Sequence, residues 1–374
     1  MIQILIPLLL TIPLAAQQKV THEGADGLLF SNEKVKLIVL PTGGAFASFT
    51  LNDDPNHLNT MWDPARMARE LNNRPNFGPS KGHFLCVDGF GSVTKPEQAA
   101  GLPGHGEANK LPWELAASTN SSATFKVRLP LVQENLTRKI TISPNEQIVL
   151  VESELESELP FDRVILWAEH ATIGAPFLKL GKTIVDQSTI DCQTKPYKGE
   201  RTGPRTFPSA QNFKWPELPG FGNLRTSPAK NDTMNHIGCL MDPARNHEFI
   251  TAIDTETNLM LGYLFPRNDY AWVQHWMHYP ANGAYAWGLE FGMQPYDTTK
   301  ADLLSMTPLF GAPTFRWLQA KSKLSARFLM FVTKVPAGFD RVDDVRLDGA
   351  NLVIENKKSN RRITLPFSNH ALIQ

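Results

Sequence analysis

The chain has 374 residues, of which 37 are basic and 37 acidic, so its formal net charge is zero. A balanced charge excludes the general affinity for nucleic acid or anionic membranes that a strongly basic chain would have. Hydrophobic residues make up 42% and charged residues 20%, a globular composition at a length that allows one large or two medium domains. Gly and Pro number 25 and 28 while helix signals are few, which favours an all-β chain with many turns.

The N-terminal segment is apolar and ends in the small residues Ala15 and Ala16. It is too short for a spanning helix with proper flanks, and the two alanines offer a cleavage site, although no Lys or Arg precedes the apolar run. We therefore predict that residues 1–16 are a signal peptide and that the protein is secreted or periplasmic. No later run is long and apolar enough to cross a membrane, so beyond export we expect no membrane partner.

Strand-like runs follow one another along most of the chain. Residues 35–40 and 45–51 are joined by Pro41-Thr42-Gly43-Gly44, which is typical of a hairpin. Further strands are predicted at residues 125–129, 136–142, 148–155, 164–172, 249–253, 259–265, 285–291 and 326–335. Residues 345–366 indicate a final hairpin. We find no fixed-period repeat and no linker, so we expect residues 19–374 to form a single all-β domain.

Two long irregular stretches interrupt these strands, at residues 52–107 and 195–235. In the first, which is rich in Pro, Gly and Asn, only residues 64–71 look helical. Irregular stretches of this length inside a compact domain are usually functional. We expect residues 72–107 and 195–235 to border a binding site and to shape its specificity.

Three cysteines, Cys86, Cys192 and Cys239, are too few for a disulfide framework, and their odd number leaves at least one thiol free. One bridge can form among them. Their wide spacing matches no zinc pattern, so we expect mostly buried small residues and no metal.

Residues 285–297 set one carboxylate, that of Glu290, inside an apolar and aromatic run. The bulky side chains take alternate positions, at Tyr285, Trp287, Leu289 and Phe291. Alternation predicts a strand with one bulky face and with Glu290 on the other. Gly288 and Gly292 flank the carboxylate, and glycines inside a strand mark a bulge or the close approach of a ligand.

Two interpretations of Glu290 are open. A carboxylate among aromatic side chains can have a raised pKa and act as a general base. Alternatively, Glu290 caps a strand end or pairs with an arginine such as Arg316 or Arg327.

Two histidines lie beside turn residues. His170 ends a predicted strand just before Gly174 and Pro176, and His105 lies between two glycines in Gly104-His105-Gly106. Imidazole can donate or accept a proton near neutral pH, and the glycines let a substrate approach the ring. For either histidine taken alone, a structural role is the more common one.

Aromatic residues offer further ligand contacts. His275 precedes His278 by three residues, a spacing that suits a metal pair on a helix, but this segment looks extended, so we predict an aromatic wall and no metal. Tryptophans can stack on sugar faces or fill a core: Trp113, Trp272, Trp276 and Trp287. We expect Trp287 to be structural.

His105, His170 and Glu290, in this order and in these contexts, resemble the aldose 1-epimerase (galactose mutarotase-like) superfamily. The most specific match is Leu289-Glu290-Phe291-Gly292-Met293-Gln294-Pro295-Tyr296-Asp297. In that family a similar Leu-Glu, followed by Gln and Pro-Asp, carries the catalytic base. The segment Pro41-Thr42-Gly43-Gly44-Ala45 also resembles the family's opening hairpin.

The resemblance implies a β-supersandwich of large antiparallel sheets with a sugar in a cleft, and no cofactor. It makes His170 the acid that protonates the ring oxygen and Glu290 the base that deprotonates the anomeric hydroxyl. The two side chains are expected to face one cavity with room for a sugar ring between them. The expected substrate-binding residues are His105, Arg74, Trp113, His275 and Trp276.

Two departures from the family pattern leave three hypotheses open. Typical mutarotases carry an aromatic residue and an arginine where this chain has Gly106-Glu107-Ala108-Asn109, and the two long loops indicate a different or larger glycan. The chain is then a secreted enzyme that interconverts sugar anomers, a non-catalytic carbohydrate-binding protein, or a scaffold in a polysaccharide-processing system. In each case the expected partner is a sugar or oligosaccharide, without nucleic acid, and the oligomeric state is unknown.

Overall fold

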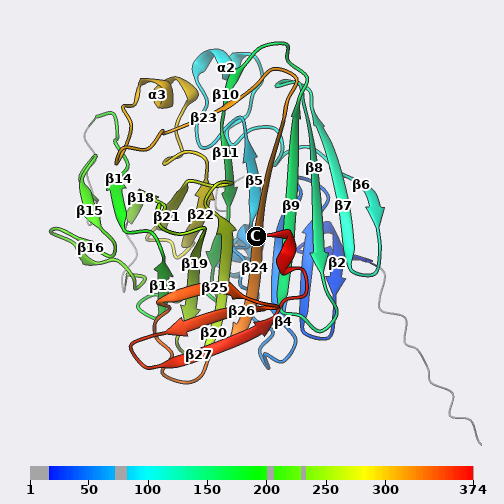
Figure 1. The fold of residues 1–374 in the computed structure, drawn as a ribbon, viewed down its shortest axis with the longest axis vertical. Helices are drawn as coiled ribbons and strands as arrows, with labels where there is room; N and C mark the ends of the chain where they lie inside the picture. Colours follow the sequence, from blue (N-terminus) through cyan, green and yellow to red (C-terminus); the bar gives the residue numbers. More distant parts are fainter. Residues whose placement is uncertain (1–16, 72–81, 200–205, 229–232, 374) are drawn as a thin grey trace, which may run out of the picture.

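Strands dominate the computed structural model, which describes residues 17–71, 82–199, 206–228 and 233–373 (Figure 1). Within these ranges the strands form five sheets, all with antiparallel pairing. No helix in the described ranges is long and apolar enough to cross a membrane. The predicted signal peptide, residues 1–16, lies outside the described residues.

One of the two large sheets has eight strands, in the order β13-β19-β20-β24-β9-β8-β7-β6. Their bounds are β6 (Glu114–Ser118), β7 (Ser122–Leu129), β8 (Glu134–Ile142), β9 (Ile148–Ser157), β13 (Thr183–Gln187), β19 (His247–Asp254), β20 (Leu259–Pro266) and β24 (Lys323–Lys334).

The other large sheet has ten strands, in the order β17-β16-β15-β14-β18-β21-β22-β11-β5, with β12 also paired to β22. Their bounds are β5 (Phe84–Val87), β11 (Trp167–His170), β12 (Thr172–Gly174), β14 (Asp191–Thr194), β15 (Asn212–Lys214), β16 (Glu217–Leu218), β17 (Gly222–Asn223), β18 (Thr233–Leu240), β21 (Trp272–Tyr279) and β22 (Ala286–Gly292).

Smaller elements complete the described chain. The remaining sheets are β1 (Gln18–His22), β2 (Ala25–Ser31), β3 (Val35–Leu40) and β4 (Ala45–Leu51); β10 (Arg163–Ile165) with β23 (Arg316–Leu318); and β25 (Asp344–Asp348), β26 (Asn351–Asn356) and β27 (Arg361–Pro366). The helices are α1 (Pro64–Glu70), α2 (Lys95–Ala99), α3 (Lys300–Ser305) and the 3-10 turn η1 (His370–Leu372).

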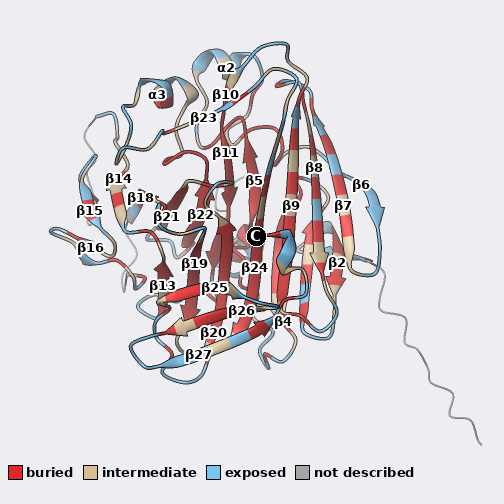
Figure 2. Ribbon diagram, in the orientation of Figure 1, coloured by how far each residue is buried: buried red, intermediate tan, exposed pale blue. Residues whose placement is uncertain are grey.

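The two large sheets pack face to face around one hydrophobic core. Phe291 of β22 lies against Tyr263 of β20 and Phe328 of β24, with ring centroids 5.5 and 5.3 Å apart. Along each strand the buried residues of this core alternate with residues of the other face, because successive side chains of a strand point to opposite sides. The central strands are accordingly buried along most of their length (Figure 2). Side chains that point away from this core reach the outer face of the ten-stranded sheet, where Trp62 and Met67 pack on Ala286 of β22.

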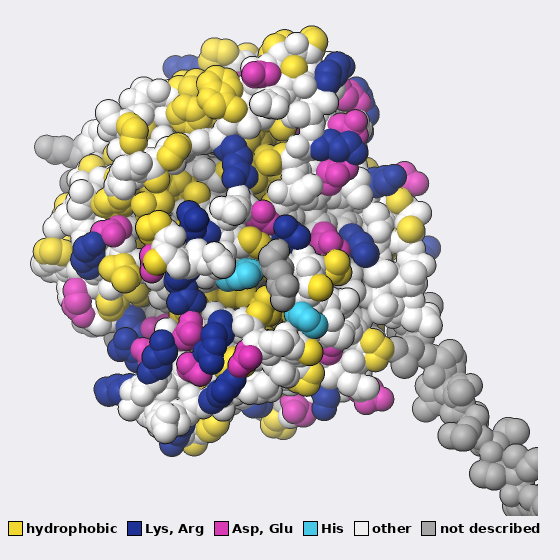
Figure 3. Space-filling view, in the orientation of Figure 1, with side chains coloured by type: hydrophobic (Ala, Val, Ile, Leu, Met, Phe, Trp, Pro, Cys, Tyr) yellow, Lys and Arg dark blue, Asp and Glu magenta, His cyan; other side chains and the backbone are white. Residues whose placement is uncertain are grey.

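The outer face of the eight-stranded sheet is covered in part by the C-terminal sheet, which crosses the lower ends of β19, β20 and β24 (Figure 1). Leu264 and Phe331 from the large sheet share a second buried cluster with Val345 and Leu352 from the small one. On the face that carries this small sheet, basic and acidic side chains lie interspersed (Figure 3).

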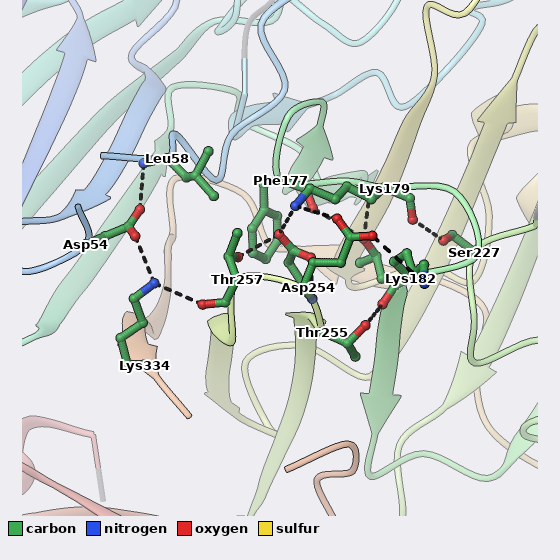
Figure 4. A network of polar contacts seen from close by, with 12 residues as sticks. Asp54, Leu58, Phe177, Lys179, Lys182, Ser227, Asp254, Thr255, Thr257 and Lys334 are labelled. Atoms are coloured by element: carbon green, nitrogen blue, oxygen red, sulfur yellow. Dashed lines mark hydrogen bonds and ion pairs between the residues drawn. The ribbon is translucent and has the colours of Figure 1, made fainter. Parts of the chain in front are cut away.

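Two buried carboxylates join loops at one end of the sheets (Figure 4). Asp54, in the loop after β4, accepts a hydrogen bond from Lys334 Nζ at 2.8 Å. Lys334 also donates to the carbonyl of Thr257 at 3.0 Å, and the Thr257 hydroxyl donates to Asp254 at 2.6 Å. Lys179 Nζ pairs with Asp254 at 2.9 Å. These contacts hold the loop after β4 against the turn between β19 and β20.

The structure confirms the all-β class and much of the strand order. The predicted hairpin at residues 35–40 and 45–51 is β3 and β4 with the predicted bounds, and the predicted helix at residues 64–71 is α1. The C-terminal hairpin has a third strand, so it is a small sheet.

Three predictions about elements need correction. Residues 164–172 are not one strand: β10 pairs with β23, whereas β11 and β12 pair with β22. The first irregular stretch contains β5 and α2, and the second contains β15, β16 and β17. These short strands were missed because the sheet, and not a local pattern, recruits them.

One disulfide is formed, between Cys192 of β14 and Cys239 of β18, which face each other across the strand pair. Cys86 is free and buried.

Candidate active site

A cavity of about 170 Å³ opens on the outer face of the ten-stranded sheet. It is lined by Trp62, Phe84, His105, Lys110, His170, His236, Trp276, Glu290 and Asp297. Pockets for drug-sized ligands have roughly 300–1,000 Å³. This cavity therefore suits a smaller molecule, and its charged and imidazole side chains suit a polar one.

Five adjacent strands of the sheet each contribute one lining residue: Phe84 from β5, His170 from β11, Glu290 from β22, Trp276 from β21 and His236 from β18. Their neighbours in sequence point the other way, into the core. The alternation predicted for residues 285–291 is confirmed: Glu290 lies on the cavity side, and Trp287, Leu289 and Phe291 lie in the core.

The Glu290 carboxylate is almost completely buried and lies between two histidines. Its Oε1 is 3.0 Å from His170 Nε2, and its Oε2 is 3.4 Å from His236 Nε2. Burial raises the pKa of Glu290, but the charge and hydrogen bonds of His170 and then of His236 outweigh burial and hold this pKa well below its usual range. Glu290 is thus a carboxylate in the ligand-free protein.

Two expectations about Glu290 are wrong. Its pKa is lowered rather than raised, because histidines reach it across the sheet. Neither arginine pairs with it: Arg316 donates to the carbonyl of Asn268, and Arg327 pairs with Asp269.

Gly288 makes room for this carboxylate. A Cβ atom at residue 288 would lie 2.7 Å from Glu290 Oε1. The sequence marked Gly288 as a point of close approach, and the approaching group is the side chain two residues further along the same strand.

His170 is held on two sides. Its ring stacks on Phe84, with centroids 4.2 Å apart and planes inclined by 19°, and its Nδ1 lies 2.7 Å from Thr172 Oγ1. These contacts direct Nε2 towards Glu290. The expected room for a sugar ring between His170 and Glu290 is absent, because the two are in direct contact. The space for a ligand lies beside the pair.

His105 is a neutral hydrogen-bond donor near pH 7. Burial, followed by the charge of His170, lowers its pKa to about 4. The backbone N–H of Gly91 lies 3.3 Å from Nδ1, and since an N–H can only donate, Nδ1 is the acceptor. The proton of the neutral ring is therefore on Nε2.

The residues after His105 are structural. Glu107 accepts hydrogen bonds from the backbone N–H groups of Leu131 and Val132, at 3.0 and 3.2 Å. Asn109 donates to the carbonyl of His105 at 2.8 Å. The departure from the family pattern thus builds a fixed turn, and Lys110 is the residue of that turn that lines the cavity.

Asp297 also lines the cavity. Its carboxylate pairs with Lys195, and its Oδ1 lies 3.6 Å from His236 Nε2. Lys195 belongs to the second of the two predicted loops, and His105 to the first. The first loop therefore borders the cavity directly, as expected, whereas no described residue of 195–235 lines it and Lys195 contacts it only through Asp297.

Not every predicted ligand contact lies at this cavity. Trp276 does, 5.6 Å from the His170 ring between centroids. Trp113 does not: it is in the hydrophobic core, where its Nε1 donates to the carbonyl of Ala108 at 2.8 Å. Arg74 lies outside the described residues.

His275 is on the wrong face of β21 for the cavity. Its Nε2 lies 2.6 Å from Gln187 Oε1, and its Nδ1 accepts a hydrogen bond from Trp287 at 3.1 Å. Because His275 and Trp276 are adjacent on a strand, only one of them can face the cavity. In the described ranges, no group of three or more His, Cys, Asp or Glu side chains is placed to hold a metal ion.

Five lining residues were not predicted: Trp62, Phe84, Lys110, His236 and Asp297. His236 and Gly238 alternate with Ile237 and Cys239, a pattern from which β18 could have been found. Phe84 and Lys110 lie in a stretch without periodicity, so the sequence offers no comparable signal for them.

Comparisons with known proteins give the fold. No protein-family model and no curated protein sequence matches the chain. A galactose mutarotase related enzyme from Lactobacillus acidophilus superposes with a TM-score of 0.58 at 12% identity, over 86% of this chain and 100% of that one. A galactose mutarotase-like protein from Clostridium acetobutylicum gives 0.56 at 11% identity, over 85% and 98%.

A third solved structure, an aldose 1-epimerase candidate from Klebsiella pneumoniae, gives a TM-score of 0.58 at 12% identity, over 83% of this chain and 79% of that one. At identities this low the likeness establishes the fold, and the activity has to be argued from the site.

Proposed function

Given that this chain has the galactose mutarotase-like fold, we propose that it is an aldose 1-epimerase-type isomerase, which interconverts the anomers of a sugar. The observation that carries the proposal is the contact of 3.0 Å between His170 Nε2 and Glu290 Oε1 at the wall of a small cavity. The reaction consists of proton transfers, the opening and re-closure of the ring C–O bond, and a bond rotation between them, without any net oxidation or reduction, so it needs no cofactor.

In the proposed mechanism, His170 donates a proton to the ring oxygen while Glu290 accepts the proton of the anomeric hydroxyl. Both oxygens are bonded to the anomeric carbon, so an acid and a base that lie side by side can serve them together. The C–O bond opens to the aldehyde, the carbonyl group rotates, and the ring closes on either face.

The low pKa of Glu290 belongs to the ligand-free protein. After burial, the charge of His170 has the largest effect on the pKa of Glu290. When a sugar accepts the proton of His170, this charge is lost. The carboxylate then becomes a stronger base while it faces the anomeric hydroxyl. His105, a neutral donor, is placed to polarise a sugar oxygen, and Trp276, Trp62 and Phe84 offer aromatic surface for the C–H groups of the ring.

We further propose that the protein is exported and that residues 19–374 form one domain. The disulfide between Cys192 and Cys239 supports export, because such bonds are typical of oxidising compartments.

The test follows a freshly dissolved single anomer by polarimetry or NMR, over a panel of neutral and acidic sugars. Wild type should accelerate equilibration, and Glu290→Gln and His170→Asn should each slow it by at least about 100-fold, the usual worth of a general acid or base. The double variant should be little slower than either single one, since the two groups act together.

The exposed Glu156→Gln variant of β9 is the matched control and should retain the wild-type rate. Wild type no faster than the blank for every sugar would favour the second candidate, a sugar-binding protein without catalysis. This second candidate is kept because His170 and Glu290 contact each other directly, which leaves no room for a sugar ring between them.

A further inference from the structure

Lys110 lines the cavity and is partly buried, yet no carboxylate among the described residues pairs with its ammonium group. The other partly buried lysines of the described chain do have a carboxylate partner. Lys195, for example, pairs with Asp297. An ammonium that is partly removed from water and left unpaired is unfavourable. Burial accordingly lowers the pKa of Lys110.

The acidic groups of the cavity already have partners among the described residues. Glu290 contacts His170 and His236, and Asp297 contacts Lys195. Neither carboxylate forms an ion pair with Lys110. Among the described lining residues, the charge of Lys110 is therefore the one left for a ligand to neutralise.

The backbone that carries Lys110 is fixed before any ligand arrives. Its own N–H donates to the carbonyl of Glu107 at 2.9 Å, and the carbonyl of Leu111 accepts from Gly43 at 2.8 Å. The turn packs closely on the β3–β4 hairpin, because a Cβ atom at Gly43 would come within 2.5 Å of the Asn109 carbonyl oxygen. A lysine on a fixed backbone can bind an anion without first ordering the main chain.

From this arrangement we infer that the cavity takes an anionic sugar, one that bears a carboxylate or phosphate group, and that Lys110 binds that group. The inference rests on the proposal that the cavity binds a sugar at His170 and Glu290. A neutral sugar would leave the ammonium unpaired, whereas a carboxylate or phosphate forms a charge-assisted hydrogen bond with it.

The test is a titration of the full-length protein with glucuronate, glucose 6-phosphate and glucose, at low salt, by calorimetry or NMR. Wild type should bind at least one acidic sugar about tenfold or more tightly than glucose, and added salt should reduce this preference. The tighter of the two acidic sugars identifies carboxylate or phosphate as the recognised group.

Lys110→Met, which keeps most of the length of the side chain and removes its charge, should abolish the preference by weakening the binding of the acidic sugar far more than the binding of glucose. Lys110→Arg should keep most of the preference. Lys126→Met, at an exposed position of β7, is the matched control and should behave as wild type. Thermal unfolding of each variant establishes that it is folded.

Several results would overturn the inference: no binding of either acidic sugar to wild type, equal affinities for glucose and the acidic sugars, or an equal loss for all three sugars in Lys110→Met. The proposed function fails in a different way. If acidic sugars bind through Lys110 but no sugar equilibrates faster than the blank, anion recognition stands and the isomerase does not. If wild type and Lys110→Met equilibrate glucose and the acidic sugars at the same rates, the isomerase stands and the inference does not.

Discussion

Adjacent residues of the central strands point to opposite faces of the sheet and have different roles. His170 faces the cavity, whereas its neighbour Glu169 points into the core and accepts hydrogen bonds from Arg138 at 2.6 Å and from His83 at 2.9 Å. Burial raises the pKa of Glu169, but the charge of Arg138 and then the hydrogen bond of His83 outweigh burial and bring this pKa to about 2. One step along β11 thus separates an ion pair buried in the core from a group proposed to act on a ligand.

His275 makes the stability of the protein depend on pH. Burial first, and then the charge of His236, lowers the pKa of His275 from its usual 6.5 to about 3. The unfolded chain takes up this proton near pH 6.5 and the folded chain only near pH 3, so stability from this group is present above pH 6.5 and is lost as the pH falls towards 3. We expect the free energy of unfolding to fall between pH 7 and pH 4, by at most about 1.4 kcal/mol per pH unit from this residue.

The measurement is urea unfolding of wild type and His275→Gln at several pH values. The variant should be less stable at pH 7, because it loses the fit to Gln187 and Trp287, and the difference should shrink as the pH falls. A residual slope from His105 and His278, whose pKa values are also lowered by burial, is expected in both proteins. Parallel pH profiles would show that His275 does not titrate in this way.

At the scale of elements, β22 organises the site because it lies between β21 on one side and β11 and β12 on the other. The break between β11 and β12 falls at Ala171, whose carbonyl accepts a hydrogen bond from Leu289 of β22 at 2.6 Å. On either side of this break, His170 and Thr172 contact each other through Nδ1 and Oγ1. The sequence predicted one continuous strand here. The interruption between β11 and β12, which it did not predict, is the feature that lets Thr172 support the His170 ring.

Gly288→Ala tests whether the Glu290 carboxylate needs the space that is left by the missing side chain at residue 288 of β22. The added methyl group would lie 2.7 Å from Glu290 Oε1, so the flexible carboxylate has to move while the backbone can stay. We expect a folded protein whose thermal midpoint changes little and whose anomer exchange slows by about tenfold or more, since small displacements at a reacting group are costly.

A double-mutant cycle isolates the cause. If alanine at residue 288 acts through Glu290, adding Gly288→Ala to Glu290→Gln should produce no further loss of rate. A further loss of similar size would place the effect elsewhere.

At the scale of the whole molecule, the fold is a stack of sheets with the cavity on an outer face. The C-terminal sheet covers part of the eight-stranded sheet, and the eight-stranded sheet covers the inner face of the ten-stranded one. The loops beside the cavity come from distant parts of the chain. The disulfide between Cys192 and Cys239 joins β14, which Lys195 directly follows, to β18, which carries His236.

Loss of this disulfide should destabilise the protein. It closes a loop of 47 residues, for which chain entropy predicts about 4 kcal/mol of stabilisation. We expect the double variant Cys192→Ser, Cys239→Ser to unfold at a lower urea concentration, with an unchanged ranking of sugar affinities wherever it is folded.

A reducing agent distinguishes the effect of the disulfide from any effect of the free thiol of Cys86. It should lower the urea midpoint of wild type and of Cys86→Ala alike, and leave the double serine variant unaffected. A reductant-insensitive wild type would contradict the stabilising role of the bridge.

The sequence by itself determined the local features. The bounds of β3 and β4, the helix α1 and the face of Glu290 follow from period-two alternation and turn residues, which act over a few neighbouring positions. The order of His105, His170 and Glu290 also pointed to the fold that the solved structures share.

The tertiary structure decided which of the chemically suitable side chains share a cavity. His236 and Lys110 join Glu290 there although no local pattern marks Lys110, and His275 and Trp113 are turned into the core. The direction of the Glu290 pKa shift depends on His170 and His236, which lie on other strands. Strand register and sheet packing set these contacts between residues far apart in the chain, and such non-local pairings are not encoded in any short stretch of sequence.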